Sequence, residues 1–437
     1  MLKAIERISK EFLELSKSKK TEIISHHDTD GITSASIISR ALERLDRKFS
    51  VRIVKQLDPD IIEKLSKDSL ILFLDLGSSG IQILKNYEKV FIIDHHEIAE
   101  KEIPENIRII NTHLFNEENI SAAGLSYLFA KNLSPENTDL ANLAVIGMVG
   151  DNHGRNLGKV YNGILADAEV VIKKGLLFYP YTRPIHKTLE FSSSLFIPGV
   201  TGNPVGVLEM LRECGIERVN GEYPTMLELN EEENSKLITS VLLRRAKKDN
   251  SDIVGNIYLV KLSSRLEDAR EISAMLNACS RLGYPEISIL LCLGNKSARQ
   301  RAENIYATYK QHLVAALNYA SSAKKIEGKG YVILNAKDQI KDTIIGTVSS
   351  IIANSPVYEE GTIIIGMAYS EKKIKISARI AGREGRNVHE VLETATKEIG
   401  GECGGHPQAA GALISLDQEQ VFLENIKRVL DIEMVKI

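Results

Sequence analysis

One stretch decides the fold of the N-terminal part of the chain, Thr21-Glu22-Ile23-Ile24-Ser25-His26-His27-Asp28-Thr29-Asp30-Gly31. Its apolar residues Ile23 and Ile24 predict a short strand, the polar residues after them predict a turn, and a helix is expected over residues 32–45. Further apolar runs follow at 51–54, 70–74 and 90–93. This alternation predicts an α/β domain with an open parallel sheet, whose ligands bind at the carboxyl ends of the strands.

The next part of the chain predicts a boundary and a mixed region. Four prolines interrupt a connector, which places a soft boundary near residue 190 (Pro180, Pro184, Pro198 and Pro204). Residues 191–325 form a mixed α/β middle region, which is a connector, an insert or the early part of a second lobe. The expected helices cover residues 121–131, 137–149, 159–175, 267–282 and 297–324, and the expected strands cover residues 253–260 and 287–293.

A new unit begins at Gly328 and alternates strands and helices again. Strands are expected over residues 331–334, 362–369 and 373–380, helices over residues 340–353 and 388–398, and a glycine-rich turn precedes a final strand. The expected fold is therefore α/β and bilobal. It has a parallel-sheet domain over residues 1–190, the mixed region over 191–325, and a smaller α/β domain over 326–437.

Length and composition narrow the class of protein. The chain has 437 residues, which at about 150 residues per domain predicts about three domains. Its 43% hydrophobic and 26% charged residues are typical of a folded soluble protein. The apolar run over residues 70–74 is far shorter than the ~20 residues that cross a bilayer, and residues 1–20 form an amphipathic helix that does not resemble a signal peptide. We therefore expect a cytoplasmic protein without a membrane partner.

Charge and cysteine content exclude further classes. The net charge is −3, from 55 basic and 58 acidic residues, so any binding of nucleic acid must be local. The four cysteines are scattered singly, which predicts reduced thiols and neither a zinc knuckle nor a disulfide framework (Cys214, Cys279, Cys292 and Cys403).

Metal-ligand residue types gather in the first polar segment. In an extended loop, His26, Asp28 and Asp30 would project to the same side, which suits divalent ions such as Mn²⁺ or Mg²⁺. A capping loop, in which Asp30 accepts hydrogen bonds from helix N–H groups, is an equally good interpretation of this segment alone.

Three more segments each deliver Asp or His at the end of an element: Asp75 after residues 70–74, Asp94-His95-His96 after residues 90–93, and Asp151-Asn152-His153 after an apolar helix. Charged side chains at such places are costly unless something binds them. The four segments together offer more ligands than one ion needs. They indicate a two-metal cluster in which a carboxylate bridges ions ~4 Å apart.

These four segments resemble, in order and spacing, the motifs of the DHH phosphoesterase superfamily, with Asp94-His95-His96 as the namesake motif. The C-terminal stretch Gly400-Gly401-Glu402-Cys403-Gly404-Gly405-His406-Pro407-Gln408-Ala409-Ala410-Gly411 resembles the signature of the associated DHHA1 substrate-binding domain. The resemblance implies a bilobal phosphoesterase with a metal-binding DHH domain and a smaller DHHA1-type domain.

Within the superfamily, the segments 27–33, 264–271 and 276–283 resemble archaeal RecJ-like exonucleases, which include nucleases that associate with the GINS replication complex. One position departs from the bacterial RecJ pattern, because His26 stands where those enzymes usually carry Asp. An imidazole there is closer to the pyrophosphatase and small-oligonucleotide branches. We expect His27 to be a packed or surface histidine.

The resemblance also implies roles for the site residues. One ion would be held by His26, Asp28 and Asp75, and a second by Asp30, Asp75, His95 and Asp151, so that Asp75 bridges them. His96 would face the scissile phosphate, and Asp94 would orient a histidine.

The C-terminal glycines and a nearby strand supply candidate substrate ligands. Gly404 and Gly405 permit a close backbone approach, so their amides can bind a phosphate while His406 donates a further hydrogen bond. A simple tight turn is the alternative interpretation. Ser377 and Arg379 lie at the end of a predicted strand, where Arg379 either binds a phosphate or is a solvated surface residue.

The function expected from these features is a Mn²⁺- or Mg²⁺-dependent phosphodiesterase, a single-strand-specific exonuclease on DNA or RNA ends that acts by two-metal activation of water. One alternative is a phosphodiesterase for short oligonucleotides or cyclic dinucleotides. Another is a replication scaffold with little activity. The expected partners are single-stranded nucleic acid and GINS or other replication proteins.

Overall fold

The structure is a computed structural model, and it describes residues 1–432 with gaps at 79, 99–101, 116–117, 152–156, 179, 193–196, 246–252, 263–264, 356 and 383. Three residues of the segments named above therefore lie outside the described residues: Asn152, His153 and Ser264. The chain divides into two compact units, Met1–Tyr306 and Ala307–Ile437.

A five-stranded parallel sheet forms the centre of the N-terminal part of the first unit, with the order β2-β1-β3-β4-β5. Its strands are β1 (Thr21–His26), β2 (Phe49–Val54), β3 (Leu70–Leu74), β4 (Val90–Ile93) and β5 (Ile107–Ile110). Strands β3 and β4 are buried throughout, as expected for continuous apolar runs in a parallel sheet. The predicted α/β fold with a parallel sheet is confirmed. The strand order reverses at β1 and β3, where ligands of such sheets bind.

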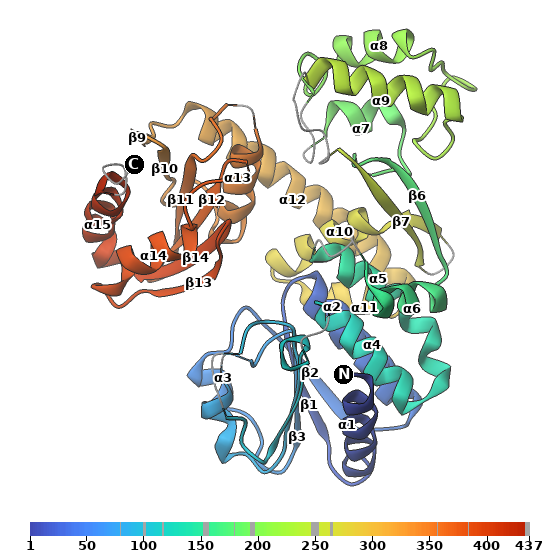
Figure 1. Ribbon diagram of the computed structural model, residues 1–437, viewed down its shortest axis with the longest axis vertical. Coiled ribbons are helices and arrows are strands. Elements are labelled where there is room, and N and C mark those ends of the chain that lie inside the picture. Colours follow the sequence, from blue (N-terminus) through green and yellow to red (C-terminus); the bar gives the residue numbers. More distant parts are fainter. Residues whose placement is uncertain are drawn as a thin grey trace. The chain divides into compact units, whose positions relative to one another are not determined.

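Helices cover both faces of this sheet (Figure 1). One face carries α1 (Leu2–Leu15), α2 (Thr29–Arg44) and α4 (Ala122–Leu133), and the other carries the short α3 (Pro59–Glu63). Helix α5 (Ala141–Gly150) packs against α2 and α4. Phe12 of α1 packs edge-on against Phe91 of β4 and Phe129 of α4, each at 5.2 Å between ring centroids. Single-turn 3₁₀ segments span Ile81–Asn86, Thr112–Leu114 and Pro135–Leu140.

The remainder of the first unit has a core of its own, which runs from Leu176 to Leu259 in the sequence. This part of the first unit contains the following elements: α6 (Lys159–Asp167), β6 (Val170–Leu176), α7 (Ile185–Glu190), α8 (Pro204–Glu213), α9 (Glu231–Arg245), β7 (Val254–Leu262), β8 (Arg265–Asp268), α10 (Ala269–Arg281) and α11 (Pro285–Cys292). Strands β6, β7 and β8 form an antiparallel sheet in that order. The soft boundary expected near residue 190 falls inside this packed core.

Two secondary-structure predictions in this part were wrong. The helix expected over 159–175 ends at Asp167, because the β-branched residues that follow it pair with β7 as strand β6. The strand expected over 287–293 is helix α11, which begins at Pro285 and buries Ile287 and Leu291 one turn apart. A short apolar run has no periodicity that separates a strand from a buried helix.

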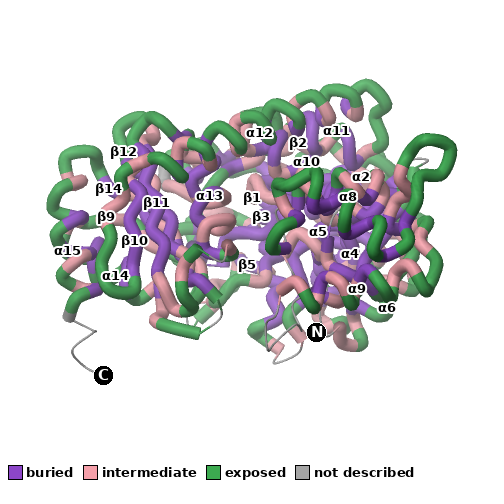
Figure 2. Tube along the Cα trace, turned by 90° about the horizontal axis from the view of Figure 1, so that it is seen from above, coloured by how far each residue is buried: buried purple, intermediate pink, exposed green. Residues whose placement is uncertain are grey.

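The second unit contains a six-stranded mixed sheet with the order β13-β14-β12-β11-β10-β9. Its elements are β9 (Ile326–Gly328), β10 (Tyr331–Asn335), α13 (Asp342–Asn354), β11 (Ile363–Ser370), β12 (Lys373–Ile380), α14 (Val388–Lys397), β13 (Glu402–His406), β14 (Ala409–Ser415), a 3₁₀ turn (Leu416–Gln418) and α15 (Glu419–Ile432). Helix α12 (Lys296–Ser322) carries the chain from the first unit into the second. Strands β10 and β11 are buried along most of their length (Figure 2).

The prediction of a glycine-rich turn before the final strand was wrong. Residues 402–406 form the edge strand β13, which pairs antiparallel with β14. Glycine is weak evidence for a turn when the neighbouring strand can bind its amides, and here Gly404 lies opposite Gly411.

Two further observations concern the whole chain. None of the described helices is long and apolar enough to cross a membrane. All four cysteines are free thiols, of which Cys214, Cys279 and Cys292 are buried.

Candidate metal centre

The first ligand segment joins the end of β1 to the start of α2. His26 is the last residue of β1, and Asp28 caps α2, because its carboxylate accepts a hydrogen bond from the N–H of Gly31 at 3.0 Å. The segment is therefore not the extended loop that the sequence predicted, since Asp30 already lies in the first turn of α2. The carboxylates of Asp28 and Asp30 nevertheless both lie near the carboxyl ends of β1 and β3.

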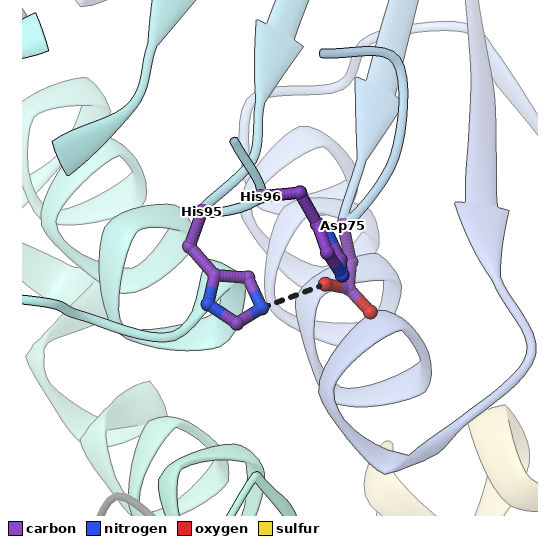
Figure 3. Close-up of side chains that lie close together, drawn as sticks. All are labelled: Asp75, His95 and His96. Atoms are coloured by element: carbon purple, nitrogen blue, oxygen red, sulfur yellow. Dashed lines mark ion pairs between the residues drawn. The ribbon is translucent and has the colours of Figure 1, made fainter. Parts of the chain in front are cut away.

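Asp75 follows β3 and lies between two histidines. Its φ of 58° is in the left-handed region, and its N–H donates to the carbonyl of Ile93 at 2.9 Å, which holds that conformation. One carboxylate oxygen lies 3.2 Å from His26 Nδ1 and the other 3.4 Å from His95 Nε2. Figure 3 shows the imidazole of His95 pointing toward this carboxylate. Asp75 is only 2% exposed, and its Oδ1 has no hydrogen-bond partner among the described residues.

Strand β4 ends in Asp94, which holds the two histidines after it. The Asp94 carboxylate accepts hydrogen bonds from the N–H of His95 at 2.8 Å and of Ser78 at 3.0 Å, and it lies 2.7 Å from His96 Nδ1. Burial alone would raise the pKa of Asp94, but the bonds from His96 and Ser78 hold it well below its usual range. Asp94 is thus a buried carboxylate anion that orients His96.

Asp30 is held by the N-terminus of another helix. The N–H groups of Ala122 and Ala123, at the start of α4, donate to its two carboxylate oxygens at 2.6 and 2.9 Å. Asp30 therefore accepts hydrogen bonds from helix N–H groups, as the capping interpretation predicted. The helix is α4 and not α2, in which Asp30 itself lies. Capping does not exclude metal binding, since each carboxylate oxygen keeps a second lone pair.

Asp151 ends α5 and completes the cluster, with its carboxylate 3.0 Å from His95 Nε2. The structure brings together all six side chains that were predicted as metal ligands. Three groups have ligand atoms within 4.8 Å of one another: His26, Asp28 and Asp75; Asp30, His95 and Asp151; and Asp75, His95 and His96.

The electrostatics of the cluster show that it needs positive charge. Burial and the neighbouring carboxylates raise the pKa of Asp30 well above its usual value, and they raise the pKa of Asp75 to about 6. Burial opposes protonation of His95, yet Asp151 and Asp75 raise its pKa to about 12. Protons therefore compensate a dense group of buried carboxylates. Divalent cations would compensate the same charge, and the carboxylate and imidazole donors fit Mn²⁺ or Mg²⁺.

His27 stands apart from the ligands. Its ring packs edge-on against that of His26 at 4.7 Å between centroids, and its Nδ1 is buried without a hydrogen-bond partner among the described residues. Burial lowers the pKa of His27 to about 3, so the ring is neutral. His27 is a packed histidine in this structure.

Asn111 is a residue of the site that the sequence analysis missed. Its amide nitrogen donates to the carbonyl of His96 at 2.8 Å and to the hydroxyl of Ser78 at 2.9 Å, and the side chain is fully buried. Asn111 thus joins the two segments that hold Asp94. A signal existed, because Asn111 follows the apolar strand β5 as Asp75 follows β3.

The candidate substrate ligands of the second unit lie on β12 and β13, the two strands that flank β14. Arg379 of β12 and His406 of β13 pair with the same residue, Ala409 of β14, and Ser377 and Gly404 both pair with Gly411. Paired residues of antiparallel strands share a face, so these four residues lie on one face of the sheet, with β12 and β13 roughly 10 Å apart.

Helix α13 covers part of this face. The hydroxyl of Ser350 accepts a hydrogen bond from Arg379 Nε at 2.9 Å, and Arg379 Nη1 also donates to the Ala378 carbonyl at 2.8 Å. Arg379 is therefore partly buried and held, not a freely solvated side chain. Gly405 has a φ of 140°, and a side chain there would lie 2.5 Å from the carbonyl oxygen of Ala409, so the position requires glycine.

Fold and site together define a class of protein. It is an α/β protein of two compact units, and its first unit carries Asp and His side chains with metal-ligand geometry at the carboxyl edge of a parallel sheet. Family models match three parts of the chain: the N-terminal domain of the DHH family over residues 20–148, the DHH-CID domain over residues 177–254, and the DHHA1 domain over residues 317–431. The chain therefore contains a DHH domain and a DHHA1 domain, as its motifs predicted.

Comparison with individual proteins supports the same fold. An uncharacterized protein of Methanocaldococcus jannaschii is 29% identical over 450 residues, which cover 98% of each chain. The structure is similar to that of RecJ from Thermus thermophilus with Mn²⁺, with a TM-score of 0.62 and 17% identity. That match covers 98% of this chain but 54% of the RecJ chain.

Cdc45 from Entamoeba histolytica has a similar fold along its whole length. The TM-score is 0.65, the identity is 12%, and the match covers 98% of this chain and 99% of Cdc45. The fold is therefore shared by proteins described as RecJ and as Cdc45.

Proposed function

We propose that this protein is a divalent-metal-dependent phosphodiesterase that removes nucleotides from the ends of single-stranded DNA or RNA. One observation carries the proposal: residues from four segments of the first unit, 26–30, 75, 95–96 and 151, place their Asp and His ligand atoms within a few ångströms of one another. The similar RecJ structures, which are described with Mn²⁺ and with Mg²⁺, support the choice of ion.

Two ions are proposed, each with its own ligands. His26, Asp28 and Asp75 would hold one, and Asp30, Asp75, His95 and Asp151 would hold the other, so that both oxygens of Asp75 are used. Bound there, the ions would lower the pKa of a water molecule toward 7 and neutralise charge on the phosphate. The buried Oδ1 of Asp75 has the 3.4 Å ion pair with His95 but no hydrogen bond among the described residues, which supports this assignment.

His96 is proposed to contact the scissile phosphate. Its side chain is 46% exposed while its Nδ1 is fixed by Asp94, so the other ring nitrogen is available to a substrate. The pKa of His96 is raised, first by the hydrogen bond from its ring to Asp94, which favours an imidazolium that can donate to a phosphate oxygen.

The second unit is proposed to bind the strand. Ser377, Arg379, Gly404, Gly405 and His406 would bind a phosphate or terminal nucleotide. Four of them share one face of the sheet, and Gly405 lies between two of these four on the edge strand β13. The amide-rich edge strand and one held guanidinium suit an anion.

A second candidate function is a scaffold in a replication complex, with GINS or another replication protein as partner. The similarity in fold to Cdc45 favours it. The complete set of Asp and His ligands argues against it, since a scaffold has no need to keep six costly ligands together. A third candidate is a phosphodiesterase for short oligonucleotides or cyclic dinucleotides. His26 favours it, because an imidazole at this position resembles the small-oligonucleotide branch of the superfamily.

Digestion of end-labelled strands separates these candidates. We expect the protein to shorten single-stranded DNA or RNA of about 20 nucleotides in Mn²⁺, with mononucleotide products, and to act more slowly on blunt duplex because unpairing an end costs a few kcal/mol. Faster hydrolysis of dinucleotides than of long strands would favour the third candidate. The absence of hydrolysis of any of these substrates in either ion would contradict the proposal.

A further inference from the structure

A buried contact joins α10 to the middle of the first ligand segment. Thr29 lies between Asp28 and Asp30, and its hydroxyl donates to the carbonyl of Ser273 at 3.0 Å. The two hydroxyls also lie 2.9 Å apart, so the hydroxyl of Ser273 can donate to that of Thr29 in return. Thr29 is 1% and Ser273 7% exposed, so water does not compete for these bonds.

The end of α5 meets the same contact. A side chain at Gly150 would lie 2.8 Å from Cβ of Thr29 and 3.2 Å from the hydroxyl of Ser273. Gly150 directly precedes Asp151, which lies beside His95. Ser273, Thr29 and Gly150 therefore form a junction that touches both segments carrying Asp28, Asp30 and Asp151.

Ion pairs hold the start of α10 in place, and Ser273 of the junction lies on this helix. Glu267 accepts a hydrogen bond from Arg299 Nη1 at 2.6 Å, and Glu271 accepts one from Arg183 Nε at 2.7 Å. Asp268 pairs with Arg270 at 2.6 Å and accepts the N–H of Tyr181 at 3.0 Å. The three acidic residues are all buried: Glu267, Asp268 and Glu271. The stretch 265–271, which has no ligand in the metal centre, thereby holds Ser273 in place.

We propose that Ser273 is a positioning residue of the metal centre, which fixes the spacing of the carboxylates of Asp28, Asp30 and Asp151 through Thr29 and Gly150. The inference rests on the proposed function only in that the cluster binds divalent ions. Ser273 itself lies outside every group of candidate ligands. Its role is to keep the ligand segments close before an ion binds, so that binding does not have to order them.

The expected effect is on metal affinity. Residues that orient metal ligands typically change affinity about 10–100-fold when they are replaced. Because Ser273 acts through Thr29 and not on a ligand directly, we expect the lower end of that range. Thr29→Val removes both hydrogen bonds and should weaken Mn²⁺ binding about tenfold, whereas Ser273→Ala keeps the carbonyl that accepts one of them and should weaken binding by less. The double variant should be no weaker than Thr29→Val alone, since Thr29→Val already removes the whole contact.

The experiment measures Mn²⁺ binding by equilibrium dialysis on the full-length protein, together with urea unfolding and the Mn²⁺ dependence of strand hydrolysis. Ser280→Ala is the matched control, because Ser280 lies on the same helix with the same 7% exposure and its hydroxyl has no partner among the described residues. Thr29→Ser keeps the hydroxyl and should keep wild-type affinity. Excess Mn²⁺ should restore hydrolysis in Ser273→Ala.

Each outcome decides the inference. Weaker Mn²⁺ binding in Ser273→Ala and Thr29→Val, with unchanged binding in Ser280→Ala and Thr29→Ser, supports it. Unchanged Mn²⁺ binding in Ser273→Ala and Thr29→Val would overturn the inference, whatever the stability of these variants. The proposed function would still stand in that case, provided that the wild-type protein binds Mn²⁺ and hydrolyses the strand. Equal weakening in Ser280→Ala would also overturn it, because the effect would then belong to the helix. Failure of the wild-type protein to bind Mn²⁺ would overturn both.

Discussion

At the scale of single residues, the metal centre depends on side chains that fix other side chains. Asp94 and Asn111 are buried. Asp94 accepts a hydrogen bond from the N–H of His95 and holds the ring of His96, and Asn111 donates to the carbonyl of His96. Asp75 adopts a left-handed backbone conformation that most residues avoid. Such strain is typical of a functional position, because the surrounding structure has to maintain it.

Asn111→Ala is expected to loosen the site as well as the fold. The variant leaves the His96 carbonyl and the N–H of His113 without their buried partner, which should lower the free energy of unfolding by about 1–3 kcal/mol. It should also lower the rate of strand hydrolysis at limiting Mn²⁺ about tenfold or more. Urea unfolding and a Mn²⁺ titration of the rate measure the two effects.

Asn137→Ala is the matched control for this prediction. Asn137 is equally buried and donates to the carbonyl of Ala130 at 2.8 Å, and the other described hydrogen bond of its side chain is with Arg44, so both partners lie outside the ligand segments. It should lose similar stability and keep the wild-type rate at each Mn²⁺ concentration. A wild-type rate in Asn111→Ala, or an equal loss of rate in Asn137→Ala, would show that Asn111 has no role in the site.

At the scale of elements, two helices approach closely at a glycine beside a ligand. A side chain at Gly147 of α5 would lie 2.4 Å from Cβ of Ala123 and 2.7 Å from Oδ1 of Asp30. Neither neighbour can move freely, since Asp30 accepts two hydrogen bonds from the start of α4. The close packing of α2, α4 and α5 is therefore part of the metal site.

Gly147→Ala should damage stability and metal binding together. Overpacking a close contact costs about 1–3 kcal/mol, and displacement of Asp30 should weaken Mn²⁺ binding. Gly163→Ala is the control: Gly163 lies in α6 with nothing within 4 Å of the added methyl group, so this variant should gain about 0.5–1 kcal/mol of stability. Thermal unfolding and equilibrium dialysis measure both. Wild-type Mn²⁺ affinity in a folded Gly147→Ala protein would contradict the prediction.

Much of the element pattern could be predicted, and the errors have physical reasons. Four strands of the parallel sheet were predictable from short apolar runs, whereas β5 was not predicted. The site was predictable because three of these strands end in or are followed by Asp or His, and the ends of parallel strands meet at one edge. Helix α11 was predicted as a strand, and strand β6 was predicted as part of a helix. Short apolar runs have no hydrophobic periodicity that separates the two. The contact of Thr29 with Ser273 could not be predicted, since it joins residues 244 positions apart without a charge or a motif.

At the scale of the whole molecule, the proposed function assigns chemistry and strand binding to different units. The candidate ligands for metal all lie in the unit Met1–Tyr306, and the candidate ligands for the strand all lie in the unit Ala307–Ile437. Arg379→Ala and His406→Ala should therefore bind Mn²⁺ normally but lose about 1–3 kcal/mol of strand affinity each, because each removes a hydrogen bond to phosphate. Single-turnover kinetics should show a raised KM.

The control for this prediction is Arg428→Ala, which removes an exposed arginine of the same unit that pairs with Glu398 at 3.4 Å. It should leave KM unchanged, since an exposed ion pair contributes little. Unchanged kinetics in both Arg379→Ala and His406→Ala would mean that this face does not bind the strand. Depleted metal in either would mean that the two functions are not separate.

Replacement of Asp75 tests the central claim most directly, because this one carboxylate is assigned to both ions. Asp75→Asn keeps the shape of the side chain and tolerates the left-handed backbone, and Asp75→Ala removes the ligand entirely. Bound Mn²⁺ per chain and hydrolysis of an end-labelled single strand are measured on both variants and on the wild-type protein, with circular dichroism to establish folding. We predict two ions per wild-type chain, and folded variants that lose metal and all measurable hydrolysis. Full turnover by a folded Asp75→Ala protein would contradict the account.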